Sequence, residues 1–199
     1  MSQHDKRRII AAMQLSLDGC IEGPDGELDW IDNWEDAYGL MAQVDTCLLG
    51  AGMYPGYEQY WTAVLAEPGA PLPFSGKAAT QGEVDYANFA RRTPHVVLSK
   101  TLQGVAWDNT HVVRDLDHIR HLKQHPGKDI HAVGGAALVS SLLEANLIDE
   151  LRLAIHPIVL GRGKLLFTGI AGRHGLELLQ TRPLPGGTVE LSYRVQAAT

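Results

Sequence analysis

Apolar residues occur along the chain in short runs, separated by polar stretches rich in glycine, proline and aspartate. The run at residues 8–15 (RIIAAMQL) is apolar almost throughout, which is typical of a strand buried on both faces of a parallel sheet. The whole pattern predicts strands at residues 8–15, 46–50, 95–99, 130–133 and 150–160, short strands near residues 105 and 112, and helices at residues 33–44, 54–65, 84–91, 115–125 and 136–145.

The last third of the chain has a different character. Residues 176–181 and 188–195 flank a Pro-Gly-Gly turn at 185–187, and every second residue from Val189 to Val195 is apolar. That alternation is typical of a half-buried strand. Strands separated by helices, followed by an antiparallel finish, predict an α/β fold. We expect a mostly parallel central sheet with helices on both faces and a C-terminal antiparallel hairpin.

Length and composition favour a single globular domain. The chain has 199 residues, of which 45% are hydrophobic and 20% charged. These values are ordinary for a soluble domain, so we expect one domain spanning residues 1–199. The stretch at residues 67–82, rich in glycine and proline, is predicted to be a surface excursion because strands resume directly after it.

Charge and cysteine content restrict the possible partners and the compartment. The formal net charge is −6, which argues against a nucleic-acid partner or an anionic membrane surface. No uncharged apolar run approaches the length of a membrane span. Cys20 and Cys47 are far apart and show no CxxC pattern, so we predict a cytoplasmic, reducing location.

Two junctions in the sequence join a strand to a helix through glycine, at residues 48–53 (LLGAGM) and 132–136 (AVGGA). A helix N-terminus presents unpaired N–H groups, and glycine lets a phosphate approach that backbone closely. Together the two junctions could hold a dinucleotide pyrophosphate, although each alone is also what a tight strand-to-helix turn requires. Neither is a GxGxxG motif followed by an acidic residue, so a Rossmann fold is not indicated.

A third segment with polar groups follows the predicted strand at residues 95–99. Ser99, Lys100 and Thr101 place two hydroxyls and an ammonium at its end. This set could bind the 2′-phosphate that distinguishes NADPH from NADH, or it could form an exposed polar turn.

No metal site is predicted. His118, His121 and His125 lie near one face of a predicted helix. Neither cysteines nor a compact carboxylate set completes a coordination sphere around them, so we expect these histidines to face water.

Seven segments occur in one order along the chain: SLDGCI (16–21), DWI (29–31), LLGAGMY (48–54), VVLSKT (96–101), AVGGAALVSSLL (132–143), DEL (149–151) and HPIVLGRGKLLF (156–167). In this combination the chain resembles the dihydrofolate reductase superfamily over residues 9–195. It is most similar to the reductase domain of riboflavin biosynthesis and the stand-alone relatives of that domain.

The resemblance implies an NADPH-binding site. Backbone around Gln14 and Ile21 would meet the nicotinamide carboxamide. The phosphates would lie against Gly50, Ala51, Gly52, Met53, Gly134, Gly135 and Ala136, and the 2′-phosphate would face Ser99, Lys100 and Thr101.

Two positions depart from the pattern of the dihydrofolate reductases. Ala51 stands where many of them carry arginine, so a preference for NADPH would depend on Lys100. Their folate-binding arginine falls on Thr93, with Arg91 and Arg92 beside it, which puts a dedicated folate reductase in doubt.

The resemblance also implies a proton donor on a helix that follows Trp30. Counting from Trp30 leads to Glu35, with Asp32 and Asp36 as competitors. A carboxyl group in an apolar pocket has a raised pKa and can protonate or orient a substrate nitrogen. The alternative is that all three are acids favoured by a helix N-terminus. We expect Trp30, Met53 and Tyr54 to supply the apolar walls.

These inferences together predict an NADPH-dependent reductase. Its substrate would contain a C=N bond, in a pteridine or an open-chain ribosylaminopyrimidine, or would be another small carbonyl or imine. Arg162 or Lys164 would meet a substrate phosphate or form a solvated turn. The alternative is a non-catalytic nucleotide-binding or sensing module on the same fold. Because no helical pattern follows residue 172 to cover the last strands, we also expect a homodimer.

Overall fold

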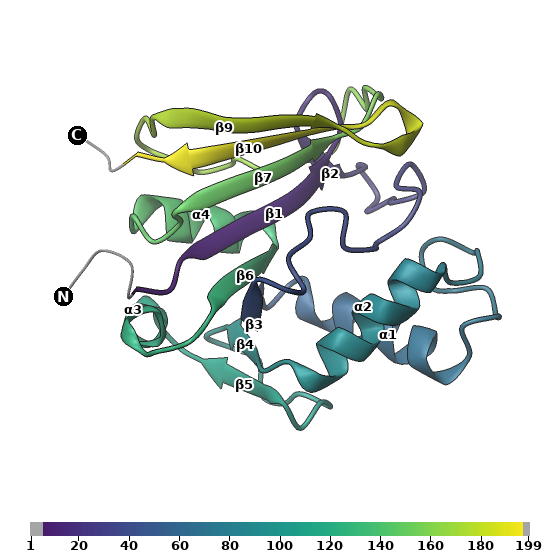
Figure 1. Cartoon of the computed structure of the whole chain (residues 1–199), viewed down its shortest axis with the longest axis horizontal. Coiled ribbons are helices and arrows are strands. Elements are labelled where there is room, and N and C mark those ends of the chain that lie inside the picture. The colour runs from purple at the N-terminus through teal and green to yellow at the C-terminus, as the bar shows by residue number, and fades with distance from the viewer. Residues whose placement is uncertain (1–5, 197–199) are drawn as a thin grey trace.

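An eight-stranded sheet runs through the molecule, and the C-terminal hairpin forms one of its edges (Figure 1). The computed structural model describes residues 6–196. The strand order is β5-β4-β3-β6-β1-β7-β10-β9. Neighbouring strands from β5 to β7 are parallel, whereas β10 is antiparallel to both β7 and β9. This arrangement confirms the predicted parallel sheet with its antiparallel finish.

The strands of this sheet are β1 (Ile9–Leu15), β3 (Val44–Gly50), β4 (His95–Leu98), β5 (Thr110–Val113), β6 (Asp129–Gly134), β7 (Glu150–Ile155), β9 (Leu176–Pro183) and β10 (Val189–Val195). Two short strands, β2 (Cys20–Glu22) and β8 (Lys164–Leu165), pair with each other in a separate antiparallel ribbon.

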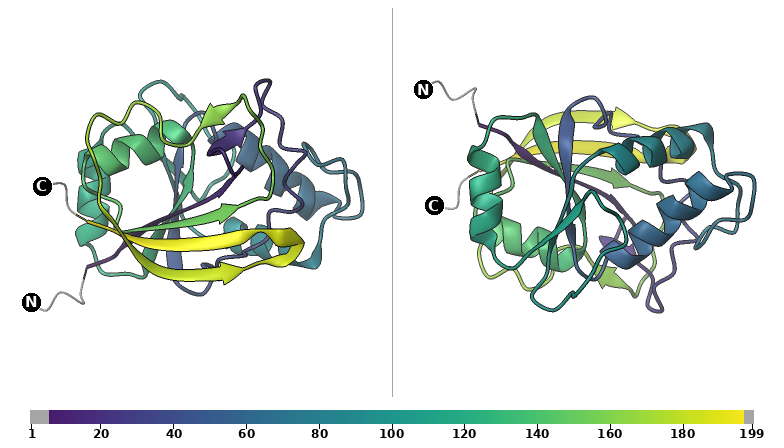
Figure 2. Two further views of the ribbon diagram at one scale, coloured as in Figure 1. Left: turned by 90° about the horizontal axis from the view of Figure 1, so that it is seen from above. Right: turned by 90° about the horizontal axis from the view of Figure 1, so that it is seen from below.

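Helices cover both faces of the sheet, as the sequence predicted. The helices are α1 (Tyr54–Ala66), α2 (Gln81–Arg92), α3 (Leu116–Gln124) and α4 (Ala136–Glu144). Alternate residues of β1, from Ile9 to Leu15, pack with the apolar residues of α3 and α4, and Ile10 and Ala12 face the other side, where α1 and α2 lie. Figure 2 shows the two helix pairs separated by the strands. The burial of β1 on both faces explains its continuous apolar run.

The helix predicted at residues 33–44 is wrong, because this segment forms turns that lead into β3. The two carboxylate oxygens of Asp36 accept hydrogen bonds from the backbone N–H groups of Leu40 and Met41, each at 2.8 Å. Gly39 has a φ of 67°, which interrupts helical geometry. Leu40 still packs against β1, so its apolar character reflects core burial without a helix.

Two strand predictions also need correction. The segment near residue 105 forms a loop, in which the backbone N–H groups of Ala106 and Trp107 donate to the carboxylate of Glu58. The strand predicted at residues 150–160 ends at Ile155. Beyond it, the chain turns and is tied by a backbone hydrogen bond from Leu17 to Ile158.

Candidate functional site

The carboxyl ends of β1, β3, β4 and β6 meet at a cavity of about 640 Å³. Open α/β sheets bind their ligands at this edge, where loops and helix N-termini converge. The remaining walls come from α1, α2, α4, the ribbon of β2 and β8, the loop at residues 26–38, and Phe74. The sequence-predicted residues are therefore expected at this cavity.

All the predicted cofactor-binding residues except Gly134 line this cavity. They are Gln14, Ile21, Gly50, Ala51, Gly52, Met53, Ser99, Lys100, Thr101, Gly135 and Ala136. Gly134 is buried beneath the cavity lining, and a β-carbon there would lie 2.4 Å from the Met13 sulfur. Gly134 therefore serves the packing of β6 against β1.

The glycine junctions form a cradle between two helix N-termini. Gly135 is the N-cap of α4, with a φ of 92°, and Met53 is the N-cap of α1. Gly135 has no side chain and that of Met53 accepts no hydrogen bond, so neither N-cap residue caps its helix through a side chain. A β-carbon on Gly52 would meet no atom within 4 Å, and one on Gly135 would meet its first at 3.8 Å. The cradle thus offers open space and the positive ends of two helices, which suits a pyrophosphate.

The loop after β4 presents Lys100 at the cavity. Ser99 is buried, and its hydroxyl accepts hydrogen bonds from the backbone N–H groups of Thr101 (3.2 Å) and Leu102 (2.8 Å). Arg114 donates to the carbonyls of Ser99 and Leu102 at 2.9 and 3.0 Å. These contacts fix the turn and leave the exposed Lys100 as its cationic group beside the cavity.

Gln14 is held in place by partners that sequence reasoning missed. Its amide nitrogen donates to the carbonyl of Asn33 at 3.1 Å, and its amide oxygen lies 2.7 Å from Nε2 of His156. Burial lowers the pKa of His156, so the ring is neutral at neutral pH. Trp30 packs edge-on against this ring with the centroids 5.3 Å apart. Trp30 therefore supports the site from outside the cavity lining.

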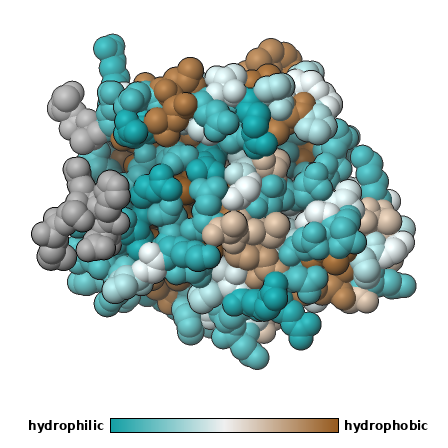
Figure 3. Space-filling model, viewed as in Figure 1, coloured by the Kyte–Doolittle hydropathy of each residue, from teal (hydrophilic) through white to brown (hydrophobic). Residues whose placement is uncertain are grey.

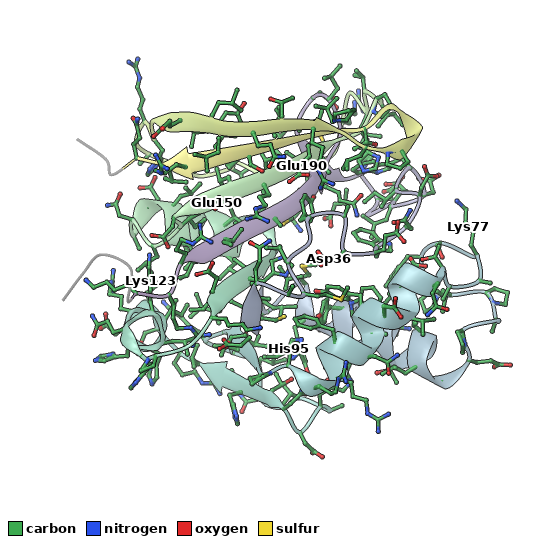
Figure 4. All side chains as sticks on the ribbon, viewed as in Figure 1. Asp36, Lys77, His95, Lys123, Glu150 and Glu190 are labelled. Carbon is green, nitrogen blue, oxygen red and sulfur yellow. The ribbon has the colours of Figure 1, made fainter. Side chains whose placement is uncertain are left out.

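The three candidate acids occupy different surroundings. Glu35 lines the cavity but is exposed, so it lacks the apolar surroundings expected of the proton donor, and the Thr80 hydroxyl donates to its carboxylate at 3.4 Å. Asp36 also lines the cavity, between the sheet and helices α1 and α2 (Figure 4), but both of its oxygens accept backbone N–H groups. Asp32 is exposed outside the lining, 3.8 Å from the ammonium of Lys77. Tyr54, expected as a wall residue, is buried elsewhere, with its hydroxyl 3.2 Å from that of Thr110.

An aromatic wall bounds the cavity on the side of α1 and α2. It consists of Trp34, Tyr57, Tyr60, Trp61, Phe74 and Tyr86. The Tyr60 hydroxyl donates to the carboxylate of buried Glu83 at 2.7 Å, and the same carboxylate accepts the backbone N–H of Trp34 at 3.0 Å. Tyr57, Tyr60 and Trp61 share one face of α1, but their meeting with Trp34 and the residues of α2 spans about fifty positions, so sequence reasoning did not find the wall.

The imidazole, phenol and thiol groups packed around the aromatic wall are uncharged at neutral pH. Tyr57 lies 3.1 Å from Nε2 of His95 and 3.4 Å from the hydroxyl of Tyr86. Burial lowers the pKa of His95 and of His131 to about 4. Burial also raises the pKa of the Cys47 thiol to about 12 and keeps both tyrosines protonated.

Within residues 6–196, no group of three or more histidine, cysteine, aspartate or glutamate side chains is arranged to hold a metal ion. Over the same residues, no helix is long and apolar enough to cross a membrane. His118 and His121 lie exposed on α3, and His125 follows its last turn.

The architecture and the cavity define a protein of the dihydrofolate reductase-like class. Residues 7–189 match the RibD C-terminal domain family, and the chain belongs to that family, whose members are reductases of the riboflavin pathway. It is 34% identical over 193 residues to the Bacillus subtilis protein YyaP, covering 94% of this chain and 95% of YyaP.

Solved structures share the fold at low sequence identity. A putative riboflavin biosynthesis protein from Shewanella sp. PV-4 aligns with a TM-score of 0.69 and 20% identity, covering 95% of this chain and 99% of that one. Dihydrofolate reductase from Enterococcus faecalis, complexed with NADP(H), aligns at 0.59 and 14%, covering 95% and 96%. The Thermotoga maritima deaminase/5-amino-6-(5-phosphoribosylamino)uracil reductase aligns at 0.63 and 13%, covering 95% of this chain and 56% of that one.

Proposed function

We propose that this protein is an NADPH-dependent reductase that delivers a hydride to a C=N bond of a small heterocyclic substrate. The observation that carries the proposal is the glycine cradle between the N-termini of α1 and α4, beside Lys100 and within one cavity. A dinucleotide pyrophosphate suits the helix ends, and an ammonium at the neighbouring loop suits a 2′-phosphate. The NADP(H) complex of the Enterococcus faecalis reductase supports this assignment by analogy of fold.

The protein's own residues bind and orient the cofactor and the substrate, and they exclude water from the site. The backbone around Gln14 and Ile21 would hold the carboxamide of the nicotinamide, and the hydrogen bonds of the Gln14 side chain to Asn33 and His156 fix the end of β1 for that contact. When bound, the reduced nicotinamide supplies the hydride. Glu35 provides or orients the proton, since the oxygens of Asp36 are already engaged by backbone N–H groups. The aromatic wall keeps water from the reacting atoms.

Turnover decides between a reductase and a binding module. NADPH oxidation is followed by nicotinamide absorbance across a panel of dihydropterins and aminopyrimidines. We expect at least one member to be reduced with NADPH consumed in equal amount. Tight NADPH binding without turnover of any member would contradict the reductase and favour a sensing module.

Lys100→Ala tests which group reads the 2′-phosphate. Loss of a partly exposed ammonium–phosphate contact costs about 1–3 kcal/mol, so NADPH should bind about ten- to a hundredfold more weakly. NADH affinity should stay nearly unchanged. Lys77→Ala, at an exposed lysine outside the cavity lining, is the matched control. Equal losses for both cofactors would remove Lys100 from this role.

We also propose that the protein forms a homodimer through its C-terminal strands. The edge strand β9 exposes Leu176, Leu178 and Leu179, and Figure 3 shows apolar surface along the side of the molecule where β9 lies. An open apolar edge is stable when a second copy covers it, and a two-fold contact leaves no edge free. Light scattering should give about twice the 21.7 kDa of one chain. A mass that stays at one chain at high concentration would contradict the dimer.

A further inference from the structure

The charges around the cavity are distributed unevenly. Its lining contains two cationic side chains among residues 6–196, Lys100 and Lys164. Lys100 belongs to the loop that we assign to the cofactor. The ammonium of Lys164 forms an ion pair with Glu22 at 2.9 Å, and Glu22 itself lines the cavity. Lys164 is therefore already paired with a carboxylate and Lys100 is assigned to the cofactor, so neither is left to bind an anionic substrate.

The aromatic wall and its surroundings carry negative charge. Glu35 and Asp36 line the cavity next to Trp34, and the carboxylate of Glu83 lies directly behind Tyr60, whose hydroxyl donates to it. His131 also lines the cavity, but burial lowers its pKa to about 4, so it adds no positive charge at neutral pH. A phosphate or carboxylate placed against this wall would meet like charges without a compensating cation.

The other positions that could have bound an anionic substrate lie outside the cavity lining. Thr93 is buried, and its hydroxyl donates to the carbonyl of Phe89 at 2.8 Å; neither it nor the exposed Arg91 and Arg92 lines the cavity. Arg162 lies outside the lining too. Lys77 is exposed on the loop before α2 and points away from the helices (Figure 4).

The wall itself offers flat, polarisable surface. Phe74 is 52% exposed and stacks on Tyr60 with an interplanar angle of 23°. Trp34, also partly exposed, belongs to the same lining. Aromatic faces of this kind bind planar rings by stacking, and the stacking does not need a charge on the ligand.

From this arrangement we infer that the substrate is a flat ring system without an anionic group, bound against the aromatic wall. The inference rests on the proposed function and narrows its substrate. It sets this chain apart from the Thermotoga maritima reductase, whose named substrate carries a phosphoribosyl group. The expectation that Arg162 or Lys164 meets a substrate phosphate is therefore replaced.

Binding to the NADP⁺-saturated protein, measured by calorimetry, tests the inference. The probes are two pairs that differ only in a phosphate: uridine with uridine 5′-monophosphate, and 7,8-dihydroneopterin with 7,8-dihydroneopterin 3′-monophosphate. We expect the member without the phosphate to bind at least about tenfold more tightly in each pair, since like charges oppose the other member. Equal or tighter binding of the anionic members would overturn the inference, as would a failure of both uncharged members to bind.

A pair of variants tests the wall itself. Phe74→Ala should weaken 7,8-dihydroneopterin binding about five- to tenfold, because it removes an exposed stacking face. Phe167→Ala, at a similarly exposed phenylalanine outside the lining, is the matched control and should change nothing. An unchanged affinity in Phe74→Ala would also count against the inference. NADPH affinity, measured first in every variant, reports on the proposed function separately, because it does not require the wall.

Discussion

Two buried histidines should make this protein sensitive to mild acid. His95 is fully buried at the start of β4, between Tyr57 and Trp107 at ring-centroid distances of 5.5 and 5.3 Å. His131 is 6% exposed on β6. Burial lowers the pKa of both rings to about 4 because each imidazolium would lose its hydration. The positive charge of Arg152 adds to the effect at His131, and Glu58 opposes it at His95.

The sign and size of the effect follow from proton linkage. Below pH 6.5 the unfolded chain binds protons at both histidines, whereas the folded protein resists doing so until about pH 4. The free energy of unfolding therefore falls as the pH drops through this window, and these two groups leave it constant above. The fall in pKa from 6.5 to about 4 corresponds to about 3 kcal/mol for each histidine.

The assay is urea unfolding, followed by tryptophan fluorescence at several pH values between 7.5 and 4. Wild-type stability should decline across the window, and His131→Leu or His95→Gln should each remove a large share of that decline, beside the contribution of His156, whose pKa burial also lowers. The comparison uses the slope against pH, because either substitution also changes stability at neutral pH. His111→Leu, at an exposed histidine on β5, is the control and should keep the wild-type slope. A double variant with an undiminished slope would refute the reasoning.

Further substitutions separate packing from binding at the cavity. Gly134→Ala should destabilise the fold by about 1–3 kcal/mol in thermal unfolding, because its β-carbon would collide with the Met13 sulfur at a φ of 138°. Gly135→Val should abolish NADPH binding in the protein that still folds, at a further cost in stability because valine is strained at a φ of 92°. Retained binding would return this glycine to a structural role. Asp36→Ala should cost about 1 kcal/mol of stability through the lost backbone hydrogen bonds. An unchanged unfolding midpoint in Asp36→Ala would show that water replaces those bonds without loss.

The sequence alone determined the elements whose pattern is local. The continuous apolar run of β1 reports burial on both faces, and the alternation from Val189 to Val195 reports the C-terminal hairpin. Glycine junctions at the ends of β3 and β6 marked where backbone turns sharply into α1 and α4. Each of these signals depends on neighbours within a few residues, so no tertiary contact was needed to recognise it.

Only the tertiary structure decided the features that depend on distant partners. Residues 33–44 carry an apolar pattern compatible with a helix, yet the carboxylate of Glu83, 49 positions away, accepts the backbone N–H of Trp34. The contact between Gln14 and His156 spans 142 positions. Side-chain acceptors from distant parts of the chain compete with local helical hydrogen bonds. The packing of α2 and β7 in the fold places these acceptors next to the segment. The aromatic wall, and with it the inferred choice of substrate, depends on that packing.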